Sequence, residues 1–167
     1  MYTPDQVRAA EQPLLARLGE KLMLSAAFAV AVECARLLDH HPYGKRVLVL
    51  AGSGGNGGDA LYAAEELERR GAHITVWQTS TGLHHAYRRP EEPTAAAAAR
   101  ADLIIDGVVG IGASGGLRGE AAQVASIIAE HATCPVVAVD IPSGVDPMTG
   151  VPGDSYIRAT NTVTFGG

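Results

Sequence analysis

The chain has 167 residues, of which 47% are hydrophobic and 19% are charged, and this composition predicts one ordinary globular domain with its own core. Its net charge of -5 argues against binding to the phosphate backbone of a nucleic acid, so no nucleic-acid partner is expected. The uncharged apolar stretch Leu22–Val32 is about half as long as a membrane span, and the first residues lack the layout of a secretion signal. With two cysteines, too few for a disulfide framework, the sequence predicts a cytoplasmic protein without a membrane partner.

The N-terminal region has the pattern of two helices. Thr3, Pro4 and Gln6 are placed as an N-cap, a first helical residue and the far side of a capping box, which together start a helix. Pro13 is expected to end this helix. A second, alanine-rich helix is then predicted over about 19–38.

From residue 45 onwards, apolar runs alternate with helical patterns. The run Arg46–Ala51 is almost continuously apolar, as in a strand that is buried on both faces. Strands that alternate with helices predict an α/β fold, a three-layer α/β/α sandwich around a Rossmann-like, mainly parallel sheet. The strand at Arg46 is expected at the centre, between those that begin near His73 and Leu103. The further expected strands cover 73–78, 103–106, 135–140 and 162–165, and the expected helices cover 59–70, 90–100 and a segment around 121–128.

A loop rich in glycine or polar residues follows three of these strands. The loops are Gly52–Asp59, Asp106–Gly116 and Asp140–Gly144. In an open parallel sheet, ligands bind at the carboxyl ends of the strands, where the strand order reverses. If the three strands are neighbours, the three loops meet in one crevice, and the sequence predicts a binding site there.

The first loop has glycines at positions 52, 54 and 57, which is the spacing of a dinucleotide-binding fingerprint. The acidic partner expected about 20 residues later is missing, because the second strand ends in Trp77-Gln78-Thr79-Ser80. There is also no Gly-Lys-Ser/Thr sequence for a P-loop. Two interpretations stay open, a structural turn and a phosphate cradle of backbone N–H groups at a helix N-terminus, and the helix-terminus argument favours the cradle.

Four polar side chains in these loops are candidates for chemistry. Asn56, Asp106 and Ser143 supply one oxygen-bearing side chain from each loop. One carboxylate with two neutral groups suits neither a divalent nor a transition-metal ion. With help from backbone carbonyls, the same three groups could hold a monovalent cation. From spacing alone, the alternative that these residues cap turns is favoured. Asp140 follows a buried strand, where desolvation raises the pKa of a carboxyl group toward the range useful for acid–base catalysis. Its alternative role is to cap the turn 142–144.

Taken in order, several segments of the chain carry a likeness to one family. They are Leu22-Met23, Val47–Ala60, Asp106–Gly112, Leu117–Gly119, Val139–Asp146 with Thr149-Gly150, and Ala159–Phe165. Together they resemble the NAD(P)H-hydrate epimerase family, the YjeF N-terminal domain. Members of this family repair NADH and NADPH that have been hydrated at the nicotinamide ring. They interconvert the R and S epimers at the hydrated carbon, so that a stereospecific dehydratase can use both.

The resemblance implies an enzyme, an isomerase, with hydrated NADH or NADPH as its substrate and K⁺ as its cofactor. It places the potassium ion on Asn56, Asp106 and Ser143, where the ion would neutralise charge beside the nucleotide and fix the loops. Asp140 would be the catalytic acid–base group, which helps hydroxide leave and then activates a water for addition to the other face. The substrate-binding residues that the resemblance implies are Gly55, Asn56, Gly57, Gly58, Asp59, Gly110, Ile111, Gly112, Ala113, Ser114, Gly115, Gly116 and Asp140.

The chain also departs from the family pattern. Gly55 and Ala60 stand where the first loop usually has Asn and Gly, and the segment 79–102 is shorter than usual by a helix and an outer strand. The sequence stops at Gly167, before a Pro-Lys-containing stretch and a further strand. We therefore expect residues 1–167 to be a single YjeF N-terminal-like domain that is incomplete at its C-terminus.

Partners and alternatives follow from the same resemblance. It is compatible with a homodimer and with fusion to, or cooperation with, an NAD(P)H-hydrate dehydratase. Two alternatives stay open. One is a non-catalytic nucleotide-binding or protein-interaction module on the same fold. The other is an ordinary NAD-binding dehydrogenase domain, against which the missing acidic residue argues.

Overall fold

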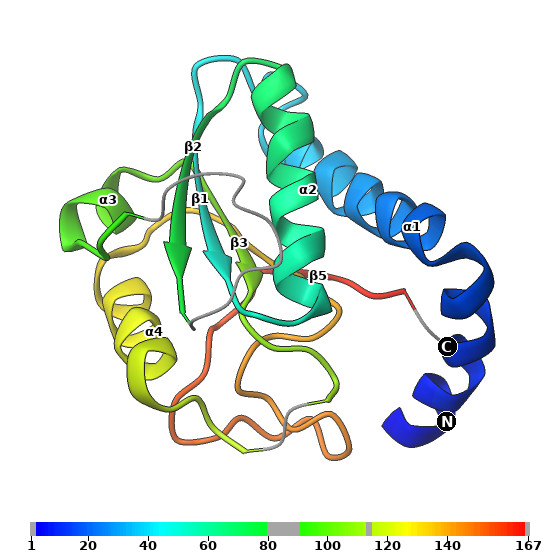
Figure 1. The fold of residues 1–167 in the computed structure, drawn as a ribbon. Helices are drawn as coiled ribbons and strands as arrows, with labels where there is room; N and C mark the ends of the chain where they lie inside the picture. The colour runs from blue at the N-terminus through cyan, green and yellow to red at the C-terminus, as the bar shows by residue number, and fades with distance from the viewer. Residues whose placement is uncertain (1–2, 80–90, 113–114, 166–167) are drawn as a thin grey trace.

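The computed structural model describes residues 3–79, 91–112 and 115–165, and it confirms the α/β fold predicted from the sequence (Figure 1). From residue 46 to residue 139 strands alternate with helices, as the apolar runs indicate, and the last strand follows without a helix before it. The elements are α1 (Pro4–Leu37), β1 (Arg46–Ala51), α2 (Gly55–Arg69), β2 (His73–Gln78), α3 (Ala95–Arg100), β3 (Leu103–Gly107), α4 (Gly119–His131), β4 (Val136–Val139) and β5 (Asn161–Val163).

The five strands form one sheet in the order β2-β1-β3-β4-β5, and every pair of neighbours is parallel. As predicted, β1 lies between β2 and β3. The strand order reverses at β1, because the chain passes from β1 outward to β2 and then returns to β3 on the other side. Leu50 lies beside Asp106, and Ala51 lies beside Gly107, so the loops that follow β1 and β3 begin at the same level.

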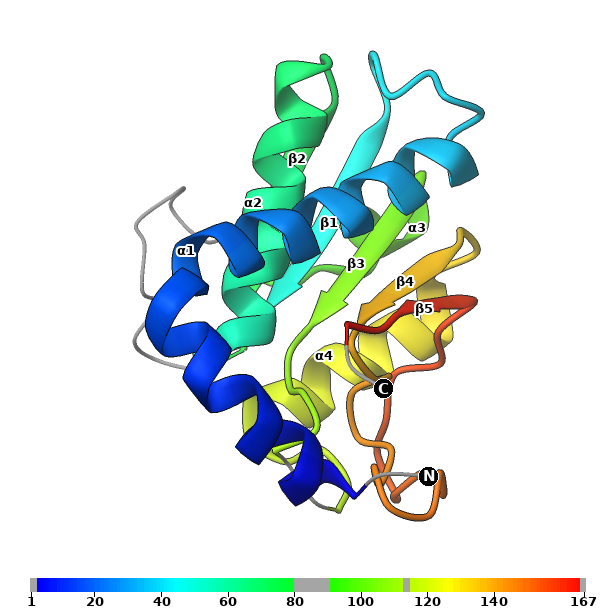
Figure 2. The ribbon, with the colours of Figure 1, turned by 90° about the vertical axis from the view of Figure 1, so that its right-hand side faces the viewer.

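Helices cover both faces of the sheet, as Figures 1 and 2 show. Along β1, Val47, Val49 and Ala51 belong to the core beneath α1 and α2, whereas Leu48 and Leu50 belong to the core beneath α3 and α4. All five are buried. Because successive side chains of a strand point to opposite faces, an uninterrupted apolar run is what a strand between two helical layers requires.

The prediction that Pro13 ends the first helix is wrong. The capping box at Thr3 and Gln6 is confirmed, but α1 continues through Pro13 as a single helix to Leu37. A proline removes one backbone hydrogen bond and crowds the preceding turn, which bends a helix without always ending it. The surrounding Ala, Leu, Glu and Arg residues favour helix on both sides of the proline, and α1 is curved in Figure 2.

Other boundaries differ by a few residues from those expected. Helix α2 begins at Gly55 and not at Asp59, so that residues 55–58 form its first turn. Similarly, α3 begins at Ala95, because the Thr94 side chain accepts the Ala97 N–H as an N-cap. Over the described parts of the chain, no helix combines the length and the apolar character that a membrane crossing needs.

Candidate functional site

The loops after β1, β3 and β4 meet at the carboxyl edge of the sheet. The Gly52 N–H donates to the carbonyl of Gly107, with 3.0 Å between N and O. A Cβ atom at Gly52 would overlap the carbonyl of Val108, and one at Gly57 would overlap the carbonyl of Gly52. Close packing therefore requires glycine at positions 52 and 57. The structural-turn interpretation accounts for this part of the fingerprint spacing.

The start of α2 also leaves donors for a ligand. Gly54 is the N-cap and has no side chain with which to cap the helix. The first N–H groups of a helix have no partner within the helix, and they attract anionic groups. A Cβ atom at Gly54 or Gly55 would meet nothing within 4 Å, so this turn faces open space. The phosphate-cradle interpretation therefore fits the geometry alongside the structural one.

Asp106 and Ser143 form a buried polar pair at the ends of β3 and β4. Both residues are fully buried. Asp106 Oδ1 accepts from the Ser143 hydroxyl at 2.6 Å, and Asp106 Oδ2 accepts from the Ser143 N–H at 2.8 Å. The Val108 N–H adds a longer contact of 3.3 Å to Oδ1. Burial raises the pKa of Asp106 to about 6 in spite of these three donors, which lower it.

Asn56 reaches across from α2 to the same place. Its Nδ2 donates to the carbonyl of Val139 at 2.6 Å and lies 3.5 Å from the carbonyl of Val109. The Ser143 hydroxyl also contacts the Val109 carbonyl, at 3.3 Å. The structure thus brings Asn56 and Ser143 to the Val109 carbonyl, with Asp106 bound to Ser143, and the role of these three residues as metal ligands stays a prediction. A Cβ atom at Gly110 would come within 2.6 Å of Asn56 Oδ1, so glycine at 110 makes room for this amide.

Asp140 lies directly after β4 in an unusual backbone conformation. Its φ is +70°, in the left-handed region that residues other than glycine adopt at a cost. Its N–H donates to Val163 at 2.8 Å, and its Oδ2 accepts from the Ile111 N–H at 3.4 Å. Burial raises the pKa of the carboxyl group, and the Ile111 contact partly opposes that rise. Such strain persists where the surrounding contacts hold a residue in place for a purpose.

Asp59 is the second carboxyl group of this edge and sits on α2. Its Oδ1 is buried and has no hydrogen-bond partner. Burial first, and the negative charge of Asp140 second, raise the pKa of Asp59 to about 6. The sequence placed Asp59 among the substrate-binding residues, but its closeness to Asp140 came only with the structure.

The remaining predicted binding residues are spread along the loop after β3. Ile111 contacts Asp140 as described, and Gly110 and Gly112 flank it. Ala113 and Ser114 lie outside the described residues. Gly116 packs against the backbone of 154–155, where a Cβ atom would come within 3.1 Å of two backbone nitrogens, and Gly115 is exposed. The described contacts therefore tie the first part of this loop to the carboxylates and the last part to the segment before β5.

Three contributors to the site were missed in the sequence. The carbonyls of Val109 and Val139 are backbone groups that no residue pattern reveals. The third is Met23 of α1, whose sulfur would lie 4.0 Å from a Cβ atom at Gly58. Helix α1 therefore packs beside the first turn of α2. The sequence had marked Met23 only as part of the family likeness, and that was the available signal.

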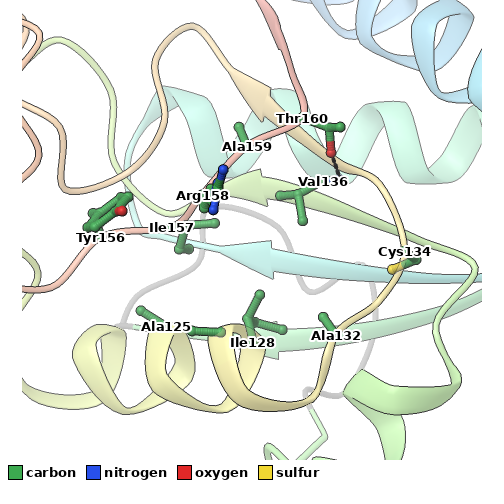
Figure 3. A pocket seen from close by; sticks show the side chains of 11 residues that line it. Ala125, Ile128, Ala132, Cys134, Val136, Tyr156, Ile157, Arg158, Ala159 and Thr160 are labelled. Carbon is green, nitrogen blue, oxygen red and sulfur yellow. Dashed lines mark hydrogen bonds between the residues drawn. The ribbon is translucent and has the colours of Figure 1, made fainter.

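A groove elsewhere in the molecule contains none of the predicted site residues (Figure 3). It has a volume of about 440 Å³ and lies between α4 and the segment before β5. Its lining residues are mostly apolar, with Ile128 of α4 on one side and Val136, Tyr156 and Arg158 on the other. Over the part of the chain that the structure describes, no three His, Cys, Asp or Glu side chains cluster to hold a metal, in the groove or elsewhere.

Comparison with known proteins identifies the family. The model of the YjeF-related protein N-terminus matches residues 19–167. The bifunctional NAD(P)H-hydrate repair enzyme Nnr of Mycobacterium tuberculosis H37Rv is 46% identical over 176 residues, which is 99% of this chain and 37% of that protein. The NAD(P)H-hydrate epimerase of Clavibacter sepedonicus is 42% identical over 186 residues, which is 99% of this chain and 79% of that protein.

A solved structure has the same fold. The crystal structure of the yeast protein YNL200c superposes with a TM-score of 0.77 at 22% identity, and the match covers 93% of this chain and 74% of that one. The chain thus spans little more than a third of the bifunctional relatives and about four fifths of the single-function relative. The matches confirm the likeness seen in the loops, and this chain belongs to the family of YjeF-related protein N-terminal domains.

Proposed function

We propose that this chain interconverts the R and S epimers of hydrated NADH or NADPH. The relatives that match it over almost its whole length are named NAD(P)H-hydrate epimerases and repair enzymes. The observation that carries the proposal is the placement of Asp140, a half-buried carboxyl group held in a strained conformation where the three loops meet. A dehydrogenase would need the acidic residue at the end of β2, which this chain lacks.

In this proposal, Asp140 is the acid–base group. A raised pKa lets a carboxyl group hold a proton near neutral pH and also release it. Asp140 donates a proton to the departing hydroxyl group and afterwards takes one from the water that adds to the other face. The open N–H groups of the first turn of α2 bind the phosphates of the nucleotide. Residues 110–112 and 115–116 form the other wall.

A monovalent cation fits the polar pair behind this site. Asp106 is a buried carboxylate, and no described Lys, Arg or His side chain forms an ion pair with it. The carbonyls of Val109 and Val139 converge on Asn56 beside it, and an amide can turn its oxygen toward the same space. We propose that K⁺ is held by Asn56, Asp106 and Ser143, where it supplies the missing positive charge and fixes the three loops.

The proposal extends to the organisation of the protein. Residues 1–167 form a single domain of this family that acts in the cytoplasm, and the bifunctional names of the relatives support its cooperation with, or fusion to, a dehydratase. A homodimer is part of the same proposal. The second candidate function, a module that binds the nucleotide without turnover, is favoured by Gly55, which offers no side chain where the family usually has Asn.

One assay separates the two candidate functions. The purified chain is incubated with each hydrated NADH epimer separately, with and without potassium, and both epimers are followed by chromatography against an enzyme-free sample. We expect interconversion that is faster than in the enzyme-free sample and that depends on potassium. Binding of the hydrate without interconversion would support the non-catalytic module and would contradict the epimerase proposal.

A further inference from the structure

Asp59 has the surroundings of a proton donor rather than of a binding residue. It lies on α2, three residues after Asn56, at the edge where the loops meet. Its Oδ1 is one of two buried side-chain polar atoms of the described residues that have no hydrogen-bond partner, the other being Trp77 Nε1. A buried carboxyl oxygen without a donor is better tolerated in the neutral, protonated form than in the charged form.

Asp140 has the opposite surroundings. Its Oδ2 accepts the Ile111 N–H, a contact that favours the ionised form. The two carboxyl groups also act on each other, because the charge of Asp140 disfavours ionisation of Asp59. Among the described side chains, Asp106 of β3 is bound to Ser143 and Val108, and α1 contributes the uncharged Met23. Neither of these two residues offsets the interaction.

Resting on the proposed function, and dividing between two residues the proton transfers that it gives to Asp140 alone, we propose that Asp59 is a second catalytic residue. Asp59 supplies the proton to the departing hydroxyl group and Asp140 keeps the role of base, so that the site holds one acid and one base. Like charges at such a pair cannot both ionise easily, so the two groups titrate as a unit. The pKa of about 6 for Asp59 keeps the proton on the pair at mildly acidic pH.

The proton and electron balance of the reaction follows from these two roles. The bond between the hydrated carbon and its hydroxyl oxygen breaks with both electrons going to oxygen, and the proton of Asp59 joins that oxygen to give water. The ring is left with a positive charge, which the lone pair of the ring nitrogen shares. A second water forms a bond to the same carbon from the opposite face and loses its proton to Asp140. Transfer of that proton back to Asp59 restores the starting state, with no other reactant consumed.

The first test is the variant Asp59→Asn, with Asp39→Asn as the matched control on an exposed aspartate whose left-handed conformation asparagine tolerates. We expect kcat to fall by about 10²–10⁴-fold in Asp59→Asn with little change in KM, and we expect Asp59→Glu to recover part of the rate. The decline of the wild-type rate above about pH 6, where the acid loses its proton, should disappear from the residual rate of Asp59→Asn. A rise in KM with an unchanged kcat and pH profile would make Asp59 a binding residue only.

The second test does not depend on activity. Titration of the carboxyl carbons in protein labelled with ¹³C-aspartate should show Asp59 titrating near pH 6 and should show its pKa falling in the variant Asp140→Asn, which removes the facing charge. An Asp59 that titrates near its ordinary value in the wild type overturns the inference. If the unmutated chain shows no epimerisation, the proposed function fails. If Asp59→Asn retains the wild-type rate, only this inference fails.

Discussion

The carboxyl edge of the sheet and the groove beside α4 are two regions of opposite character. At the edge, four carboxyl or hydroxyl groups from three loops are wholly or half buried, and one of the carboxyl oxygens has no partner. The groove has a volume of about 440 Å³, but its floor on α4 is alanine and isoleucine, and Tyr156, Arg158 and Thr160 lie on its upper side (Figure 3). The buried polar groups, and not the volume of this groove, therefore indicate where the chemistry is expected.

The difference has an energetic basis. Burying polar groups costs free energy unless they are satisfied, so a fold keeps them where they act or hold a ligand. Burying apolar side chains stabilises any fold, and an apolar depression is the ordinary result of incomplete packing between a helix and a loop. Four experiments test this contrast, beginning with the one for which we expect the largest effect.

Asp140→Asn should give the largest change. Asparagine preserves the shape of the side chain and tolerates the left-handed backbone at φ +70°, but it cannot exchange a proton. We expect the epimerisation rate to fall about 10²–10⁴-fold while the hydrate still binds. Binding is measured by calorimetric titration, and the rate by following each epimer. Equal loss of affinity and rate would make Asp140 a ligand, and a nearly unchanged rate would rule it out as the acid–base group.

Asp106→Ala should remove the response to potassium. The other proposed ligands are neutral, so the substitution deletes the only formal charge that they could share with the cation. We expect weaker nucleotide binding and a loss of at least the roughly 10–100-fold in metal affinity that removal of a supporting group costs. The measurement is hydrate binding across a series of potassium concentrations, with sodium in parallel. An unchanged potassium response in the variant would show that the ion binds elsewhere.

The stability of the chain should fall as the pH rises from about 4 to about 6 in the absence of potassium. The pKa of Asp106 is raised in the folded state to about 6, so its contribution favours folding below the unfolded value and is lost as the pH passes the folded value. A shift of about two units corresponds to about 3 kcal/mol. Urea unfolding at pH 4.5 and at pH 7.5 measures the difference in the free energy of unfolding.

Two comparisons identify the source of this pH dependence. Asp106→Asn should reduce the slope of the profile by the contribution of Asp106, because the amide does not titrate, and the slope that remains comes from Asp59 and Asp140, whose pKa values burial also raises. In the groove, the thiol of Cys134 has its pKa raised by burial to about 11, so it does not change charge over this range. A wild-type stability that increases from pH 4.5 to 7.5 would contradict the assignment of a buried, destabilising carboxylate to this edge.

Tyr156→Ala in the groove should have the smallest effect. Its side chain is 39% exposed, and substitutions at such positions usually change stability by less than about 0.5 kcal/mol. We expect a melting temperature and an epimerisation rate close to those of the unmutated chain. A rate loss of about tenfold without a loss of stability would place the groove in the functional site. The distinction between an active carboxyl edge and an inert groove would then be wrong.

The sequence by itself determined the elements, the layers and the position of the three loops. The continuous apolar run of β1 and the helical periodicity of α2 are local patterns, and each is sufficient to indicate its element. The reversal of strand order at β1 followed from the placing of the glycine-rich loops. Pro13 and the start of α2 were misjudged, because the local cost of a proline or a run of glycines is small against the packing of a whole helix.

Only the tertiary structure decided which groups touch. Asn56 and the Val139 carbonyl are 83 residues apart in the chain, and their contact depends on the order of the strands and their register. The same is true of the interaction between Asp59 and Asp140 and of the enclosure of Asp106 by Ser143. The spacing of residues in the sequence indicates which side chains are neighbours within one strand or helix. The pKa of a carboxyl group, in contrast, depends on its burial and on charges that lie on other elements. The physical state of these carboxyl groups is therefore a property of the folded chain alone.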